Sequence, residues 1–212
     1  MKKRIPIFVS FFTFLFLSAS LTANANLIIN SSFETDESIF ISGVSSFPTT
    51  FGDWGGDESA IVSAENTITP KNGNSMLKFI STYDSQDPAY SSSAVWQLVD
   101  LSSYSSEIMT GNVSVNASAF FNRVSGNNLT DTRFSLALYA MEGASSVFDP
   151  TGAFTLDAFA RSLISDSLVT TWEQILISDW LLPFSTDYLA IRVLANENKY
   201  DDVTVGVAEF DG

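Results

Sequence analysis

The sequence has no cysteine and no histidine, and only 10 of its 212 residues are lysine or arginine. Without cysteine, the chain lacks a disulfide framework, a thiolate nucleophile and any zinc or iron–sulfur site ligated by cysteine. Without histidine, Ser-His-Asp and Cys-His triads are excluded, together with imidazole-ligated metals. The remaining metal ligands are oxygen atoms, which suit calcium or magnesium.

Basic residues are few in comparison with acidic residues, which number 24, and the formal net charge is −14 at pH 7. This charge argues against a nucleic-acid-binding protein, because such proteins rely on a basic surface. The sequence also contains no nucleophile elbow, S-x-x-K motif, P-loop or dinucleotide fingerprint. A glycosidase needs two facing carboxylates, but with 24 dispersed acids some pair meets that condition by chance.

The first 25 residues are typical of a secretory signal peptide. A basic start, an apolar run and small residues at the cleavage positions follow one another: Lys2-Lys3-Arg4, Ile5 to Leu21 and Ala23-Asn24-Ala25. The alternative is an uncleaved membrane anchor, because the apolar run approaches the roughly 20 residues that span a bilayer. Cleavage after Ala25 would leave 212 − 25 = 187 residues with a net charge of 7 − 24 = −17. We therefore expect a bacterial protein that is secreted, at the cell surface or in the periplasm, with no transmembrane segment after cleavage.

Residues 26–212 are expected to form one all-β domain, a β-sandwich, because short alternating runs are separated by Gly, Asn, Asp, Ser and Pro clusters. The predicted strands are Ser75–Ile80, Ala94–Leu101, Asn112–Asn122, Arg133–Tyr139, Trp172–Ser178, Tyr188–Leu194 and Asp201–Val207. In Leu156–Ile164, apolar residues at i, i+3, i+7 and i+8 predict a short helix over the sandwich. Serine and threonine in that segment count against the helix.

Several motifs resemble one family of β-sandwiches. They are Asn26-Leu27-Ile28-Ile29-Asn30-Ser31-Ser32-Phe33-Glu34, Pro70 to Leu77, Trp96-Gln97-Leu98-Val99-Asp100-Leu101, Trp172 with Pro183, and Tyr200-Asp201-Asp202-Val203-Thr204-Val205. In this order they resemble the galactose-binding-like jelly rolls, which include carbohydrate-binding modules of families 4, 9 and 22 and exported bacterial proteins that begin N-L-I-x-N-G-x-F-E. The resemblance implies a jelly-roll topology. Two departures are Ser31, where the family usually has Gly, and the extended stretch Ala140–Thr171.

The resemblance also implies a structural calcium ion between the first and last strands, with Glu34 and Asp201 as the matching carboxylates. Independently of it, Asp201 has the strand parity of Val203 and Val205, and a carboxylate on a buried face must be paired or bound to a metal. Calcium takes 6–8 oxygen ligands, so two carboxylates and several carbonyls would suffice. The alternative is that Asp201 faces solvent.

Four aromatic residues in loop-like surroundings are candidate glycan ligands: Trp54, Tyr83, Tyr90 and Trp180. Trp54 lies in an acidic, glycine-rich segment, and the two tyrosines flank a stretch rich in Asp, Gln and Ser. An aromatic ring can stack on a sugar ring while nearby acids and amides accept its hydroxyl hydrogen bonds. For each of the four, the competing interpretation is an ordinary core or loop residue, since most large aromatics in a domain of this size are buried.

The predicted function is a non-catalytic, exported carbohydrate-binding-like module for a surface, matrix or environmental glycan. The alternative is a structural or adhesive protein that binds protein partners or itself, and a glycan-degrading enzyme is the third reading. A face with exposed aromatic and polar residues would favour glycan binding, whereas a fully packed face with every tryptophan buried would argue against it. The sequence predicts neither the sugar nor the oligomeric state.

Overall fold

The structure is a computed structural model, and it describes residues 26–35, 46–80, 92–123, 132–165, 171–197 and 205–207, with backbone alone for 197 and 205–207. The predicted signal segment and the site candidates Tyr83, Tyr90 and Asp201 lie outside these residues. Within the described part of the chain, the helices are too short and too polar to cross a bilayer.

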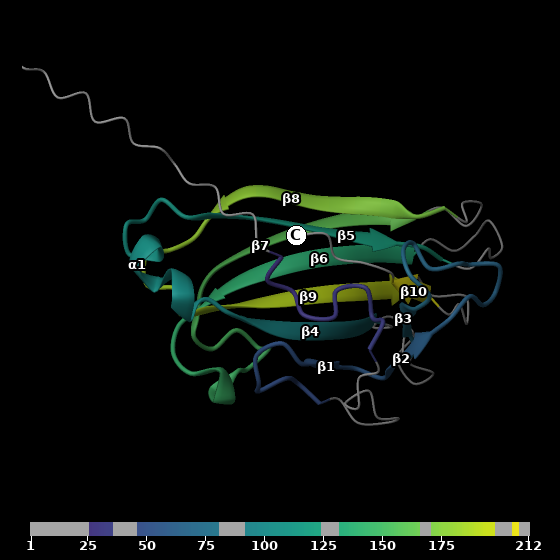
Figure 1. Ribbon diagram of the computed structural model, residues 1–212, viewed down its shortest axis with the longest axis horizontal. Helices are drawn as coiled ribbons and strands as arrows, with labels where there is room; N and C mark the ends of the chain where they lie inside the picture. Colours follow the sequence, from purple (N-terminus) through teal and green to yellow (C-terminus); the bar gives the residue numbers. More distant parts are fainter. Residues whose placement is uncertain are drawn as a thin grey trace, which may run out of the picture.

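Two five-stranded antiparallel sheets pack face to face as a β-sandwich (Figure 1). The first sheet has the order β1 (Trp54–Gly56), β4 (Ser92–Asp100), β9 (Tyr188–Glu197), β6 (Thr132–Met141) and β7 (Thr155–Ser165). The second has the order β2 (Ser59–Val62), β3 (Met76–Phe79), β10 (Val205–Val207), β5 (Ser114–Phe121) and β8 (Glu173–Leu181). Most connections cross from one sheet to the other, which gives the jelly-roll topology. Three short helical segments lie in the connections: η1 (Ser102–Tyr104), α1 (Ser105–Ile108) and η2 (Ser145–Val147).

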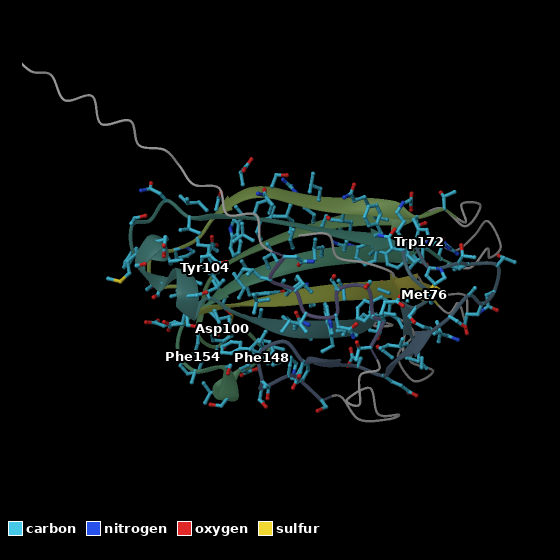
Figure 2. All side chains as sticks on the ribbon, viewed as in Figure 1. Met76, Asp100, Tyr104, Phe148, Phe154 and Trp172 are labelled. Carbon is cyan, nitrogen blue, oxygen red and sulfur yellow. The ribbon has the colours of Figure 1, made fainter. Side chains whose placement is uncertain are left out.

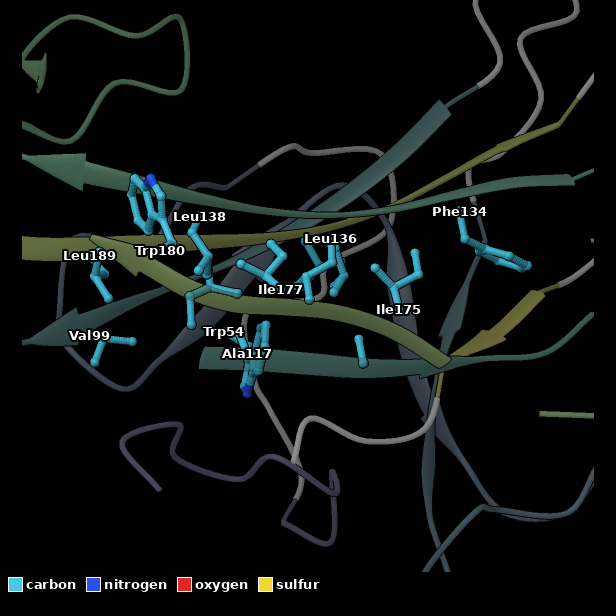
Figure 3. Packing of buried hydrophobic residues seen from close by; sticks show 14 of the residues in the cluster. Trp54, Val99, Ala117, Phe134, Leu136, Leu138, Ile175, Ile177, Trp180 and Leu189 are labelled. Carbon is cyan, nitrogen blue, oxygen red and sulfur yellow. The ribbon is translucent and has the colours of Figure 1, made fainter. Parts of the chain in front are cut away.

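The core fills the space between the sheets and follows the alternation of the strands (Figure 3). In β5, Ala117, Ala119 and Phe121 face inward and are buried. The rings of Phe121 and Phe134 stack across the two sheets with centroids 4.8 Å apart. Every strand can hide one apolar face in this way, which is why the period-two pattern of the sequence specifies a sandwich.

All seven predicted strands are present, although β10 is described only over Val205–Val207. The predicted helix at Leu156–Ile164 is wrong, because this stretch lies within the edge strand β7. Its apolar residues also fit period two: Phe159 and Leu163 lie opposite Leu138 and Phe134 of β6 and pack against the core. Pairing along the whole of β6 stabilises the strand over an isolated helix of poor helix formers.

The N-terminal segment is fixed to the sandwich by Gln97, a fully buried side chain of β4. Its Oε1 accepts the N–H of Ile29 at 3.0 Å, and its Nε2 donates to the carbonyls of Ile29 and Gly52 at 2.8 and 2.9 Å. The amide therefore replaces a strand partner for Ile29. Two residues of the N-terminal motif complete the attachment, since Asn30 turns the chain with φ of 50° and Phe33 packs on Trp54 with ring centroids 5.1 Å apart.

Candidate functional site

Trp54, the first predicted glycan ligand, is a core residue rather than an exposed loop residue. It is 0% exposed, and its Nε1 donates to the carbonyl of Ile29 at 3.0 Å. The expected acidic loop is the short strand β1, in which Trp54 lies opposite Gln97 and faces inward. Glycine lets β1 approach its neighbour, because a Cβ at Gly56, where φ is 150°, would overlap the carbonyl of Ala94. Trp54 therefore cannot stack on a sugar.

Trp180 is also buried, at 7% exposure, so its prediction as an exposed platform is wrong (Figure 3). Along β8, simple alternation from Ile175 and Ile177 would point residue 180 outward. However, Ala117 pairs with Ile177 and Val115 with Trp180, so two residues of β8 lie opposite Asn116. This β-bulge, at which Asp179 has φ of 54°, turns Trp180 into the core.

Glu34, the described half of the predicted calcium pair, is exposed and already has a structural contact. Its Oε1 accepts the backbone N–H groups of Asn74 and Ser75 at 2.8 and 2.9 Å. Gly73 has φ of 63°, and a Cβ at this position would overlap the Glu34 carboxylate. The left-handed φ therefore favours glycine at this position of the Pro70–Leu77 motif, next to the carboxylate of the N-terminal motif. Among the described residues, no group of three or more acidic side chains could hold a metal ion.

A second aromatic cluster lies on the outer face of the first sheet, away from the core. Paired residues of antiparallel strands point to the same side, and the register pairs Trp96 with Arg192 and Arg192 with Ala137. At the next pair on this side, Tyr139 lies opposite Ala190. We call this group the outer-face cluster, and its members are Trp96, Leu98, Tyr139, Met141, Phe148, Tyr188, Ala190 and Arg192.

The centre of the outer-face cluster is Trp96, whose ring touches two others. Its centroid lies 5.2 Å from that of Tyr139 and 5.4 Å from that of Phe148. The guanidinium carbon of Arg192 lies 5.3 Å from the Trp96 ring and 5.5 Å from the Tyr139 ring, within cation–π range. Trp96 is 3% exposed, whereas Tyr139, Phe148 and Arg192 are half-buried. A ligand can therefore reach these three side chains, with Trp96 as their support.

Phe148 comes from the long connection between β6 and β7, which belongs to the stretch that departs from the family pattern. Figure 2 shows Phe148 and Phe154 at the same end of the molecule as Asp100 and Tyr104. The base of the connection is fixed by backbone hydrogen bonds, from Glu142 N–H to the Phe154 carbonyl at 3.0 Å and from Asp187 N–H to the Met141 carbonyl at 2.9 Å. This places an aromatic ring at the rim of the outer-face cluster.

The outer face of β4, β9, β6 and β7 carries few charges, and two of the three are positive. The register turns Arg192, Arg133 and Asp100 outward on these strands. The Nε of Arg192 is buried without a hydrogen-bond partner, and no carboxylate of the described residues forms an ion pair with it. Burial, and then the neighbouring Asp187, raises the pKa of Tyr188, so this phenol stays neutral at physiological pH. On the described strands the outer face thus carries two arginines and one aspartate, in a protein with a net charge of −14.

None of the outer-face residues was among the predicted ligands, because a tryptophan within a strand reads as a core residue. One signal was visible in the sequence: Tyr188, Ala190, Arg192 and Leu194 alternate with Leu189, Ile191 and Val193, so both faces of this strand are largely apolar. In a β-sandwich whose two sheets pack face to face, each strand needs only one apolar face. The additional apolar residues on the outer face indicate a surface that is covered by another segment or that binds a ligand.

Comparison with solved structures finds carbohydrate-binding modules of similar fold. A family 61 module in complex with β-1,4-galactotriose is 15% identical over 88% of this chain and 96% of its own, with a TM-score of 0.49. A family 16 module is 12% identical over 88% of this chain and 98% of its own, with a TM-score of 0.46. The C-terminal family 22 module of a Clostridium thermocellum protein is 10% identical over 85% and 92%, with a TM-score of 0.42.

At these identities and TM-scores, no ligand and no residue role passes from those modules to this chain. No protein-family model matches the sequence, and no curated protein matches it. The site is therefore argued from the residues of the chain itself.

Proposed function

We propose that this chain is an exported, non-catalytic carbohydrate-binding module and that the outer face of its first sheet binds the glycan. The observation that carries the proposal is that Tyr139 and Arg192 are only half-buried, while the Arg192 guanidinium lies over the rings of Trp96 and Tyr139. The core between the sheets is complete without these residues, since they form a separate cluster. Aromatic rings with an adjacent hydrogen-bond donor are suited to a sugar, which offers C–H faces and hydroxyl oxygens at once.

The site favours binding over hydrolysis. Among the described side chains of β4, β9, β6 and β7, Asp100 is the one carboxylate that the register turns outward, and its Oδ1 accepts the N–H of Ser102 at 2.8 Å. Glycoside hydrolysis needs two carboxylates on either side of the scissile bond. A surface with one engaged carboxylate and several rings supports recognition without catalysis.

The experiment that tests this function is a glycan array probed with residues 26–212, followed by calorimetric titration of the strongest hit. Tyr139→Ala removes the reachable ring of the outer-face cluster, and we expect affinity to fall roughly 30-fold, or about 2 kcal/mol, as for a buried aromatic anchor. The matched control is Phe120→Ala on the outer face of the second sheet, where Lys71 Nζ lies 4.7 Å from the ring centroid. An array without hits, or equal losses from both variants, would contradict the proposal.

A second candidate function, adhesion to a protein partner, is favoured by exposed apolar side chains at the α1 end of the sandwich. The loops that follow β4, β6 and β8 each present one: Met109, Phe154 and Phe184 are 76%, 59% and 71% exposed. Phe154 also has a left-handed φ of 68°, which is unfavourable for an aromatic residue. Phe184→Ala therefore belongs in the same titration, and a loss of binding confined to it would place the ligand at the loops instead of the outer face.

We also propose a structural calcium ion bound by Glu34 and Asp201, as the family resemblance implies. Glu34 supports this with a carboxylate that is exposed and fixed against the start of β3 by Asn74 and Ser75. The register of β10 does not itself bring the two carboxylates together, because Val205 pairs with Phe79, at the end of β3 farther from Ser75.

The calcium proposal is tested by thermal unfolding with calcium and with EDTA. Saturation a hundredfold above Kd stabilises the native state by about 2.7 kcal/mol, which raises the Tm of a domain of this size by roughly 5–10 °C. Glu34→Gln keeps an oxygen acceptor for Asn74 and Ser75 but removes the charge, so we expect the calcium effect to disappear while the Tm in EDTA changes little. Glu107→Gln, at an exposed carboxylate hydrogen-bonded to Ser106, is the control. Equal Tm values of the unmodified protein with calcium and with EDTA would rule out the ion.

A further inference from the structure

We propose that the outer face selects a glycan that carries isolated carboxylate groups, with Arg192 as the residue that binds a uronate; this rests on the proposed function above. The first observation is the charge state of Arg192. A guanidinium remains protonated at any physiological pH. Arg192 is half-buried, its Nε is buried without a hydrogen-bond partner, and no carboxylate of the described residues neutralises its charge.

Arg192 has no acidic partner among the described residues, although the chain is rich in acidic residues. Acidic residues outnumber basic ones by 24 to 10, yet no carboxylate of the described residues forms an ion pair with Arg192. By contrast, Lys78 of β3 has Glu65 at 2.5 Å. The Nε of Arg192 is buried, but the side chain as a whole is only half-buried, so part of it remains within reach of a ligand. A ligand with an anionic oxygen would supply the negative charge that no described carboxylate supplies.

The setting of Arg192 suits a carboxylate that belongs to a sugar. The rings of Trp96 and Tyr139 lie within cation–π distance of the guanidinium and hold its plane. A fixed planar fork forms two parallel hydrogen bonds with a carboxylate, which a flexible ammonium cannot do. The sugar ring that carries the carboxylate would then contact Tyr139 or Phe148, both of which remain half-buried.

A second arginine extends the cationic surface along the sheet. Arg192 pairs with Ala137 of β6, and Arg133 lies four residues farther along the same strand on the same side. At about 3.3 Å per residue this separation is roughly 13 Å along the strand. On β6 and β7 the side chains between them are small, Ser135 and Ala137 with Ser162 and Ala160 opposite, and on β9 Leu194 lies opposite Ser135. This arrangement fits an extended oligosaccharide better than a single small anion.

The net negative charge of the protein limits how many acidic groups the ligand can carry. A polymer with a carboxylate on every residue would be repelled by a protein with a charge of −14. The combination of local positive charge and global negative charge therefore favours a mostly neutral chain with occasional acidic residues.

The test compares acidic oligosaccharides with neutral counterparts. One pair is xylotetraose with and without a single glucuronate branch, and the other is lactose with and without a single sialic acid. Each of the two acidic compounds is also compared with its methyl ester, which lacks the charge. We expect at least one free acid to bind about tenfold or more tightly than both its neutral counterpart and its ester, as for a charge-assisted hydrogen bond. The ester comparison is made with the unmodified protein, so it does not depend on how any variant folds.

Variants then assign the preference to Arg192. Arg192→Gln should make the free acid and its methyl ester bind equally, whatever the variant does to the affinity for neutral sugars, and Arg192→Lys should retain only part of the preference for the free acid. Lys71→Gln, at the cation over Phe120 on the second sheet, should change nothing. This inference is overturned if acids and esters bind equally, or if the preference for the acid survives Arg192→Gln. In either case, binding of a neutral sugar that depends on Tyr139 would still support the proposed function. Failure of every one of these saccharides to bind overturns this inference, and a glycan array without hits overturns the proposed function as well.

Discussion

Replacing Gln97 by Leu should destabilise the protein by about 3 kcal/mol or more, as measured by urea unfolding of residues 26–212. The side chain is fully buried and makes three hydrogen bonds to the backbone of Ile29 and Gly52. Leucine fills a similar volume but leaves the Ile29 N–H and the Gly52 carbonyl without this partner, and each unsatisfied buried group costs about 1–3 kcal/mol. A domain of this size has a stability of about 5–15 kcal/mol, so the variant should still fold.

The matched control is Gln174→Leu, the same substitution at an exposed position of β8. It should change the free energy of unfolding by less than about 0.5 kcal/mol. If the two leucine variants were equally stable, the hydrogen bonds of Gln97 would not be holding the N-terminal segment.

Gln97→Glu separates the hydrogen-bond pattern from the shape of the side chain. The introduced carboxyl can still accept from Ile29 N–H, but its ionised form cannot donate to the carbonyls of Ile29 and Gly52. Burial and those two carbonyls therefore raise its pKa in the folded state above the ordinary value of about 4.3. Because the folded state then binds its proton more tightly than the unfolded state, the stability of this variant should fall as pH rises above about 4.

The sandwich was predictable because its strands obey a local rule, whereas the placement of several residues depends on contacts that are distant in sequence. The alternation of apolar and polar residues in β5 and β9 is visible within a few residues, and it predicts both strands. The strand β7 looks helical in isolation, and it is extended because β6 pairs with it along its length. Similarly, nothing local shows that the glycine-rich segment at Trp54 becomes a strand opposite Gln97.

The candidate site was harder to predict than the fold, for reasons visible at two tryptophans. Trp180 alternates outward along β8 until a bulge opposite Asn116 reverses its direction, and a bulge has no signature in a single sequence. Trp96, within a predicted strand, is buried as most tryptophans are, but it lies on the outer face of the first sheet, where it contacts Phe148 and Arg192. The sequence motifs that resemble those of the galactose-binding-like jelly rolls lie at structural contacts, since Gln97 and Glu34 form hydrogen bonds that fix the N-terminal segment and Gly73 lies against the Glu34 carboxylate.

Replacing Trp54 by Ala should be as damaging as the loss of Gln97, at about 3–5 kcal/mol, because a completely buried ring is removed from the core beside Phe33. Trp54→Phe keeps an aromatic ring but loses the hydrogen bond to the Ile29 carbonyl, so about 1–2 kcal/mol is expected. Glycan affinity of the Phe variant should equal that of the unmodified protein, since Trp54 faces the core and not the outer face. A selective loss of affinity without a loss of stability would restore Trp54 as a ligand.

Trp54 and Gln97 should also depend on each other, because both donate to the carbonyl of Ile29, at 3.0 and 2.8 Å. After either single substitution the carbonyl retains one donor, so part of the cost is hidden. In the double variant, Trp54→Phe with Gln97→Leu, the carbonyl has lost both donors. The double variant should therefore lose more stability than the sum of the single variants, by about 0.5 kcal/mol or more in a double-mutant cycle. Additive losses would mean that the two side chains stabilise the N-terminal segment independently, through packing rather than through their common acceptor.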